Sequence, residues 1–140
     1  MSRVALACLL SLLSFPGTPA AAQSPEPEAL TGPTGLYVSD TAICPALSTG
    51  ATLGEAMEEN AEALALGPAG IEGFEYHCAF EPDLDLGAPD GTISTHLGYC
   101  EEPGLITPQL FTFRVETLET PRATLYDGSE TPLTFFACPG

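Results

Sequence analysis

The stretch GFEYHCAFEPDLDLGAPDG (73–91) changes character at its centre, and its two halves decide between a buried strand and a chemical site. The first half alternates aromatic or sulfur-bearing residues with polar or small ones, which is the period of a strand with one buried face. That face would carry Phe74, Tyr76, Cys78 and Phe80. His77 then lies on the opposite face from Cys78, so the two do not predict a shared metal ion. The second half is an acid-rich loop that reaches the next strand through Asp90 and Gly91, which are both common turn residues.

Five further stretches have the pattern of short strands with turn residues between them. They are GLYV (35–38), TISTHLGYC (92–100), PQLFTFRVETL (108–118), ATLY (123–126) and PLTFFAC (132–138). In TISTHLGYC the larger side chains share one face, and we expect His96 on the other, outward face. That shared face carries Ile93, Thr95, Leu97 and Tyr99. DGSET (127–131) predicts a hairpin connection between the last two strands.

One stretch has a helical signature, TLGEAMEENAEALALG (52–67). Thr52 and Glu55 stand at capping-box spacing, apolar residues recur at helical intervals, and Gly67 is a plausible stop. The alternative is an acidic excursion between two strands, in which ALAL feeds a strand instead. The sequence therefore predicts a mainly β fold, a small antiparallel barrel or sandwich of five to six strands with at most one short helix.

Residues 1–22 have the organisation of a secretory signal peptide. Arg3 stands near the start, an uncharged apolar run follows, and Ala20 and Ala22 fit the small-residue cleavage rule. The apolar run is about 12 residues, short of the roughly 20 that cross a bilayer, so we expect no stable membrane insertion after cleavage. Cys8 would leave with this segment. We expect residues 23–34 to be a flexible Pro- and Glu-rich leader and residues 35–140 to form a single domain.

Four cysteines remain in the exported chain, and their number is even. They are Cys44, Cys78, Cys100 and Cys138. In the periplasm or outside the cell, this predicts two disulfides rather than free thiols. Four cysteines allow three pairings, all of which the spacing leaves open. We expect Cys44 to pair with Cys78 and Cys100 with Cys138, because sequential pairing ties each half of the domain to itself.

The charge balance is strongly acidic. The chain has 19 Asp and Glu against three Arg and no Lys; removal of Arg3 with the signal leaves 2 − 19, a net charge of −17. Such a surface repels nucleic acid and anionic membranes, whose binding depends on Lys and Arg. It keeps an exported protein soluble, and it could also attract a cation or a basic protein.

The sequence predicts no catalytic residue, no cofactor-binding residue and no cofactor. HExxH, GxSxG, CxxC and a phosphate-binding glycine loop are all absent from the 140 residues. His77 beside Cys78 has the composition of a thiol and its base, but an exported cysteine on a buried strand face is expected to be oxidised. His96 near Ser94 belongs to no recognisable motif.

The weak candidates for a metal site are Asp83, Asp85 and Asp90, whose carboxylates suit calcium. The EF-hand spacing fails, because Gly87 and Ala88 replace the expected ligand and glycine, and Ser94 stands where the bidentate Glu should be. We expect an acidic loop without a bound ion.

Three segments carry a resemblance to a known group of proteins: GFEYHCAF, GYCEEPG and the terminal LTFFACP. They make the chain similar to short exported proteins of unknown function from Gram-negative bacteria. The resemblance covers roughly residues 35–139. It implies a periplasmic location and a disulfide-bonded β fold, and it brings no activity with it.

Two classes of function follow as expectations. The first is a periplasmic or secreted, non-enzymatic protein, a small binding or inhibitor module whose partner is a protein or a small ligand. The second is a hydrolase with paired carboxylates, for which Glu75 and Glu101 are the candidates because both lie beside disulfide-fixed backbone. Calcium binding through residues 83–90 is a further alternative.

Overall fold

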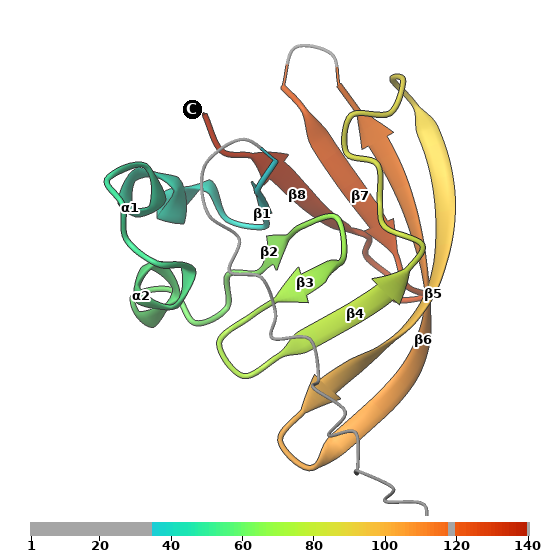
Figure 1. The fold of residues 1–140 in the computed structure, drawn as a ribbon, viewed down its shortest axis with the longest axis horizontal. Coiled ribbons are helices and arrows are strands. Elements are labelled where there is room, and N and C mark those ends of the chain that lie inside the picture. Colours follow the sequence, from blue (N-terminus) through green and yellow to red (C-terminus); the bar gives the residue numbers. More distant parts are fainter. Residues whose placement is uncertain (1–34, 118–119, 140) are drawn as a thin grey trace, which may run out of the picture.

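The structure is a computed structural model that describes residues 35–117 and 120–139. The predicted signal peptide (1–22), with Cys8, and the leader (23–34) lie outside the described residues. In the part that is described, eight strands form one closed antiparallel barrel, in which each strand pairs with the next and β8 returns to β1 (Figure 1). The strands are β1 (Tyr37–Val38), β2 (Ala65–Leu66), β3 (Gly70–Glu72), β4 (His77–Glu81), β5 (Thr92–Glu102), β6 (Leu105–Glu116), β7 (Arg122–Tyr126) and β8 (Leu133–Ala137).

The prediction of a mainly β, antiparallel barrel is confirmed, but five to six strands is too few. The two strands absent from the predicted set are β2 and β3, which have two and three residues and are too short for a period of two to show in the sequence. The strand expected to begin at Phe74 begins at His77, because the chain reverses between β3 and β4, where the Gly73 N–H donates to the Tyr76 carbonyl at 2.7 Å. Phe74 lies in this turn and is 58% exposed, so its expected place in the core is wrong. Tyr76 is half-buried, and Cys78 and Phe80 are buried as expected.

β5 turns inward the opposite face from the one expected. Leu97 is 71% exposed and His96 only 3%, so the prediction of an outward His96 is wrong. The register explains the reversal: Cys100 lies directly opposite the buried Cys78, and residues two and four before Cys100 share its inward direction. The rings of Phe80 and Phe113 already fill the space beside β5, 5.4 and 5.7 Å from the His96 ring. A flat imidazole fits there, and the large residues of β5 lie outside.

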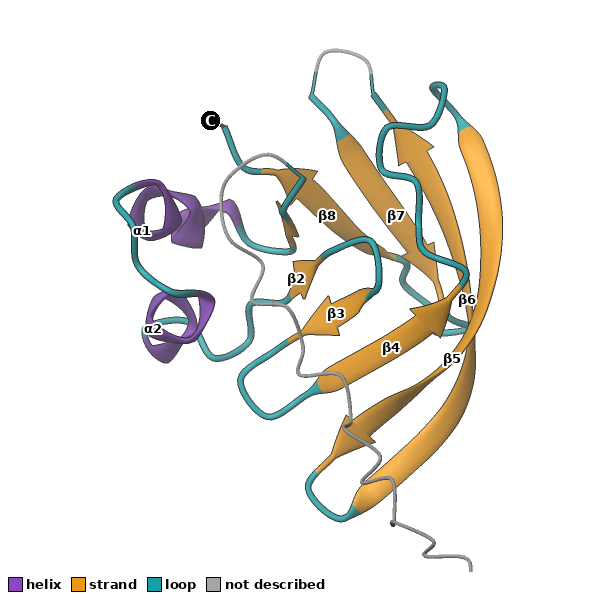
Figure 2. Ribbon diagram, viewed as in Figure 1, coloured by secondary structure: helices purple, strands orange, loops and turns teal. Residues whose placement is uncertain are grey.

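The helical prediction is right in kind and wrong in extent. Helix α2 (Leu53–Glu58) has the predicted capping box, with Thr52 and Glu55 each accepting from the other's backbone N–H. It ends at Glu58 rather than Gly67, and Ala65–Leu66 form β2, which was the alternative for ALAL. A second helix, α1 (Cys44–Ser48), follows the short helix η1 (Thr41–Ile43) directly and has Pro45 in its first turn (Figure 2).

The barrel encloses the larger of two apolar clusters. Its interior is filled by aromatic and aliphatic side chains, with Phe111, Phe113 and Phe135 fully buried. A smaller cluster lies between the two helices and the outer side of β1 and β2, where Met57 of α2 and Val38 of β1 are buried (Figure 1). Barrels of eight strands have an interior that side chains can just fill, and this chain uses that solution.

Both disulfides exist, but the expected pairing is wrong. Cys44 is bonded to Cys138, and Cys78 to Cys100. The second bond joins residues directly opposite each other on β4 and β5, and the first joins the segment after β1 to the residue after β8. Closure of the barrel brings the two ends of the domain together, which sequential pairing by halves does not anticipate.

Candidate functional site

Among the described residues, His96 is the buried polar side chain, and two hydrogen bonds hold it. Its Nδ1 donates to the backbone carbonyl of Pro82, because a carbonyl can only accept. In the neutral ring Nε2 is then the acceptor for the Ser94 hydroxyl, 2.8 Å away. Both ring nitrogens are satisfied, and phenylalanine rings pack against the imidazole. The arrangement ties the loop after β4 to β5 and is what a structural histidine requires.

The loop that His96 anchors is not the open acidic excursion that its composition indicates. Leu84 and Ala88 are buried, and the Leu84 N–H donates to the Pro68 carbonyl at 2.7 Å. Asp85 accepts from the Gly87 N–H at 3.0 Å, and Asp90 accepts from the Thr117 N–H at 2.9 Å. Asp85 therefore stabilises the loop itself, and Asp90 joins the loop to the residue that follows β6.

The weak calcium candidates therefore gain no support from the geometry. Asp83, Asp85 and Asp90 are all exposed. Within residues 35–117 and 120–139, no group of three or more His, Cys, Asp or Glu side chains is placed to hold a metal ion.

His77 and Cys78 are separated by the sheet, as predicted. Cys78 is buried and bonded to Cys100, so it offers no thiol. His77 lies on the outer face, where its Nδ1 is 2.7 Å from an Oε atom of Glu72 on the neighbouring strand β3. This contact is an ordinary cross-strand polar pair.

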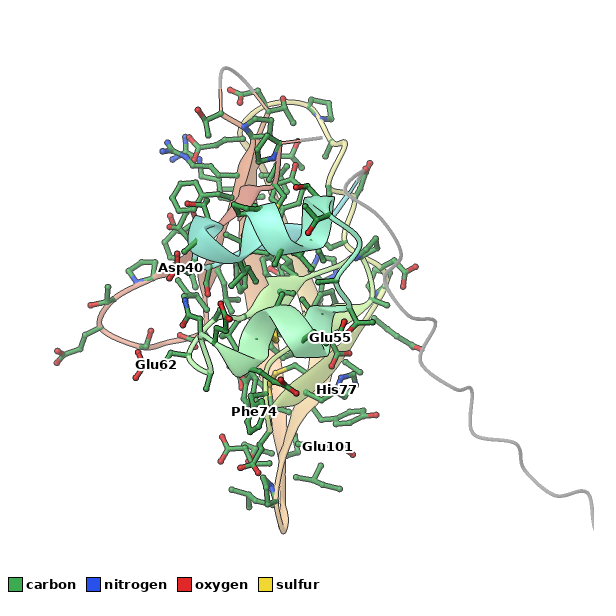
Figure 3. The ribbon with its side chains drawn as sticks, turned by 90° about the vertical axis from the view of Figure 1, so that its left-hand side faces the viewer. Asp40, Glu55, Glu62, Phe74, His77 and Glu101 are labelled. Carbon is green, nitrogen blue, oxygen red and sulfur yellow. A yellow bond between two sulfur atoms is a disulfide. The ribbon has the colours of Figure 1, made fainter. Side chains whose placement is uncertain are left out.

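The two carboxylates considered for hydrolysis do not gather at an enclosed site. Glu75 lies in the turn between β3 and β4, and Glu101 lies near the end of β5, directly opposite His77. Both are exposed (Figure 3 shows Glu101 near the protruding end of the structure). The half-buried Tyr76 follows Glu75 in the chain, and its hydroxyl is 3.1 Å from the Cys100 sulfur. Burial raises the pKa of Tyr76, and the charges of Asp127 and Glu102 raise it further, so the phenol stays neutral.

The feature with the most evident capacity for recognition is apolar and lies outside the barrel. Among the residues that the structure describes, eight large hydrophobic residues are exposed and six of them belong to β5 and β6, so the exposure is concentrated rather than scattered. Leu97 and Leu110 lie directly opposite each other, as do Tyr99 and Pro108, and all four side chains point away from the core. Ile106, 64% exposed, extends the same face toward the hairpin end. We call this surface the ribbon patch; it consists of Leu97, Tyr99, Ile106, Pro108 and Leu110.

Carboxylates border the ribbon patch. Glu81 of β4 lies opposite Leu97, and Glu101 lies opposite Ile106. The two arginines of the described residues lie at the end of β6 away from the patch. Arg114 and Arg122 both contact Glu116 there, at 3.4 and 2.7 Å. The patch is therefore an apolar surface with a negative border.

Sequence reasoning placed Leu97 and Tyr99 together but on the wrong side of the sheet. The correct pairing of Cys78 with Cys100 is the signal that would have found them, because it fixes which residues of β5 face inward. Comparison of the chain with protein-family models, with curated proteins and with solved structures gives no match. Among the described residues, no helix has the length and apolar character needed to cross a bilayer.

Proposed function

We propose that the protein is an exported, non-enzymatic binding module that holds a protein partner on the ribbon patch. The observation that carries the proposal is the concentration of exposed apolar side chains on the outer face of β5 and β6. Monomeric soluble proteins rarely expose large contiguous apolar patches, and the largest patch on a monomer is often an interaction site. Large apolar residues at the centre of a patch and charged ones at its border match the anatomy of protein interfaces.

The scaffold suits this role because it is fixed. The Cys78–Cys100 disulfide joins β4 to β5 just behind Tyr99, and the barrel interior is packed with aromatic rings. A surface held in one conformation before binding loses little conformational entropy when the partner arrives. The filled interior also favours a ligand bound outside the barrel over one bound inside it.

Export to an oxidising compartment is part of the proposal. Two disulfides support it, since such bonds persist in the periplasm or outside the cell and are rare in the cytosol. The amino-terminal signal pattern supports it independently.

The proposal is tested by comparing what the exported protein and a patch variant retain. The wild type and L97S/L110S are immobilised and exposed to the cell-envelope extract of the source organism. We expect the wild type to retain a protein that the variant loses. Ile93→Ser is the matched control, because Ile93 is an exposed apolar residue of β5 opposite Arg114, outside the patch. Identical retention by the wild type and L97S/L110S would overturn the proposed function.

A further inference from the structure

β6 is longer than the strand beside it, and this leaves part of its edge open. Residues 112–116 of β6 pair with β7, whereas residues 105–111 pair with β5 alone. The β5–β6 hairpin protrudes beyond the rest of the barrel (Figure 1). Among the described residues, no backbone hydrogen bond joins residues 105–111 to any segment other than β5. In the described part of the chain, residues 105–111 of β6 thus have a backbone edge that no second strand covers.

The orientation of Pro108 shows which groups lie on that edge. In an antiparallel sheet, successive residues turn their backbone N–H and C=O to alternate sides. Pro108 has no N–H and lies directly opposite Tyr99, so its backbone faces the open side rather than β5. Ile106 and Leu110, two residues to either side, share this orientation and turn both backbone groups to the open edge. Their side chains are 64% and 53% exposed.

We infer that the open edge of β6 receives an extended segment of a basic protein as an additional antiparallel or parallel strand. The inference rests on the proposed function and names the partner's chemistry. An added strand would lie about 5 Å from β6 and take its hydrogen bonds from Ile106 and Leu110. Its alternate side chains would pack against the same two residues, so the partner segment carries apolar residues at every second position.

Charge identifies the partner as cationic. Glu101 and Glu102 lie opposite Ile106 and Leu105 at the hairpin end, and both are exposed. Because the apolar residues of the added strand share the face of Ile106, Lys or Arg at the remaining positions would lie on the opposite face, which is the face of Glu102. A second copy of this chain would instead bring two acidic hairpins together, and each chain carries a net charge of −16. Like charges placed side by side disfavour pairing between copies.

The test uses a synthetic peptide, Ac-KVKVKVK-NH2, titrated into the ¹⁵N-labelled protein and followed by NMR. We expect amide shifts to concentrate at residues 105–111. A peptide of the same charge with N-methylated valines cannot form the ladder, so we expect it to bind about tenfold more weakly. The acidic peptide Ac-EVEVEVE-NH2 should produce no shift at these amides. Because the N-methylated peptide keeps the charge, it separates strand addition from diffuse attraction to an acidic surface.

Two protein variants locate the contact. Leu110→Pro removes an N–H that faces the open edge, where the native Pro108 also has no N–H. The substitution removes no hydrogen bond to β5. We expect it to weaken the peptide by about tenfold. Ile93→Ser lies on β5 outside the ribbon patch, opposite Arg114, and should leave the affinity unchanged.

Three results would overturn the inference. The first is amide shifts confined to β5. The second is equal affinity of Ac-KVKVKVK-NH2 and its N-methylated form. The third is a dimer of this chain in sedimentation equilibrium. If L97S/L110S loses its natural partner while the peptide fails to address the edge, the proposed function stands and strand addition is wrong. If the wild type and L97S/L110S retain the same proteins from the extract, the proposed function itself is wrong.

Discussion

Cys44 and Cys138 are joined by a disulfide across 94 residues of sequence, at the place where the first and last strands of the barrel meet. β1 and β8 share only two residue pairs, Tyr37 with Ala137 and Val38 with Phe136. One more backbone contact, from the Cys138 N–H to the Leu36 carbonyl at 3.3 Å, lies beside them. A seam this short is weak in hydrogen bonds, and the disulfide is the covalent bond that keeps it closed.

Removal of this disulfide should destabilise the fold more than removal of the other one. In the chain-entropy model a loop of 94 residues contributes about 4.7 kcal/mol and one of 22 residues about 3.4 kcal/mol. We therefore expect C44S/C138S to lower the free energy of unfolding by about 1 kcal/mol more than C78S/C100S. Denaturation in urea with both variants and the wild type measures the difference. A larger loss in C78S/C100S would show that the β4–β5 bond, rather than the seam, limits stability.

The hydrogen bonds of His96 should account for much of the order in the loop that follows β4. His96→Ala opens a cavity beside Phe80 and removes the donor to the Pro82 carbonyl, so we expect a loss of about 2–4 kcal/mol. Ser94→Ala removes one hydrogen bond and should cost no more than about 1.5 kcal/mol. Limited proteolysis of residues 82–90 checks the link to the loop. If His96→Ala matches the wild type in both stability and protease resistance, the ring does not anchor this segment.

The sequence predicts features that depend on residues close together in the chain, and it misses features that depend on contacts between distant segments. Local signals were correct: the capping box of Thr52 and Glu55 starts a helix, and Phe111 and Phe113 face the core as their alternation predicts. The sequence did not show which face of β5 points into the barrel, because the alternation of its residues allows either face to be buried. One of its faces has larger apolar residues, but the other contains Cys100, and the disulfide decides between them.

The candidate site was missed for the same reason. Leu97 and Leu110 are hydrophobic, and hydrophobic residues on an alternating strand are ordinarily assigned to a core. Leu97 is exposed because the register between β4 and β5 turns His96 and Cys100 inward, and Leu110 lies directly opposite Leu97 on the same outer face. Register between distant strands leaves no mark in a single sequence when the turns that set it are long.

Glycine at position 98 should be essential to the curvature of β5. A Cβ atom built there would lie 2.0 Å from the Ala79 carbonyl oxygen and 2.8 Å from the Phe80 Cα, and backbone atoms cannot move aside as a side chain can. We expect Gly98→Ala to lower the free energy of unfolding by about 3 kcal/mol, at the upper end of overpacking penalties. Gly54→Ala is the contrasting control. Gly54 lies in α2 with no atom within 4 Å of the added methyl group, so alanine should stabilise the protein by about 0.5 kcal/mol.

Thermal or urea unfolding of the two glycine variants checks both signs at once. Equal effects at Gly98 and Gly54 would mean that β4 and β5 can separate to admit a methyl group, and that the close approach of their backbones is not required for the barrel.

The capping box makes a predictable contribution to the pH dependence of stability. The Thr52 backbone N–H, and then its hydroxyl, hold the pKa of Glu55 below its ordinary value. A carboxylate whose pKa is depressed in the folded state stabilises the fold above its unfolded pKa, and that stability is lost as the pH falls through the folded pKa. Glu55→Gln should therefore be less stable than the wild type near neutral pH, and the difference should vanish in acid.

Glu58→Gln is the control variant within the same helix. Glu58 is the last residue of α2, where a negative charge opposes the helix dipole, so its removal should not destabilise the protein near neutral pH. Urea denaturation of both variants between about pH 6 and about pH 3 measures the two differences. A Glu55→Gln deficit that persists undiminished at the acid end would show that the loss comes from the shape of the amide rather than from the charge on Glu55.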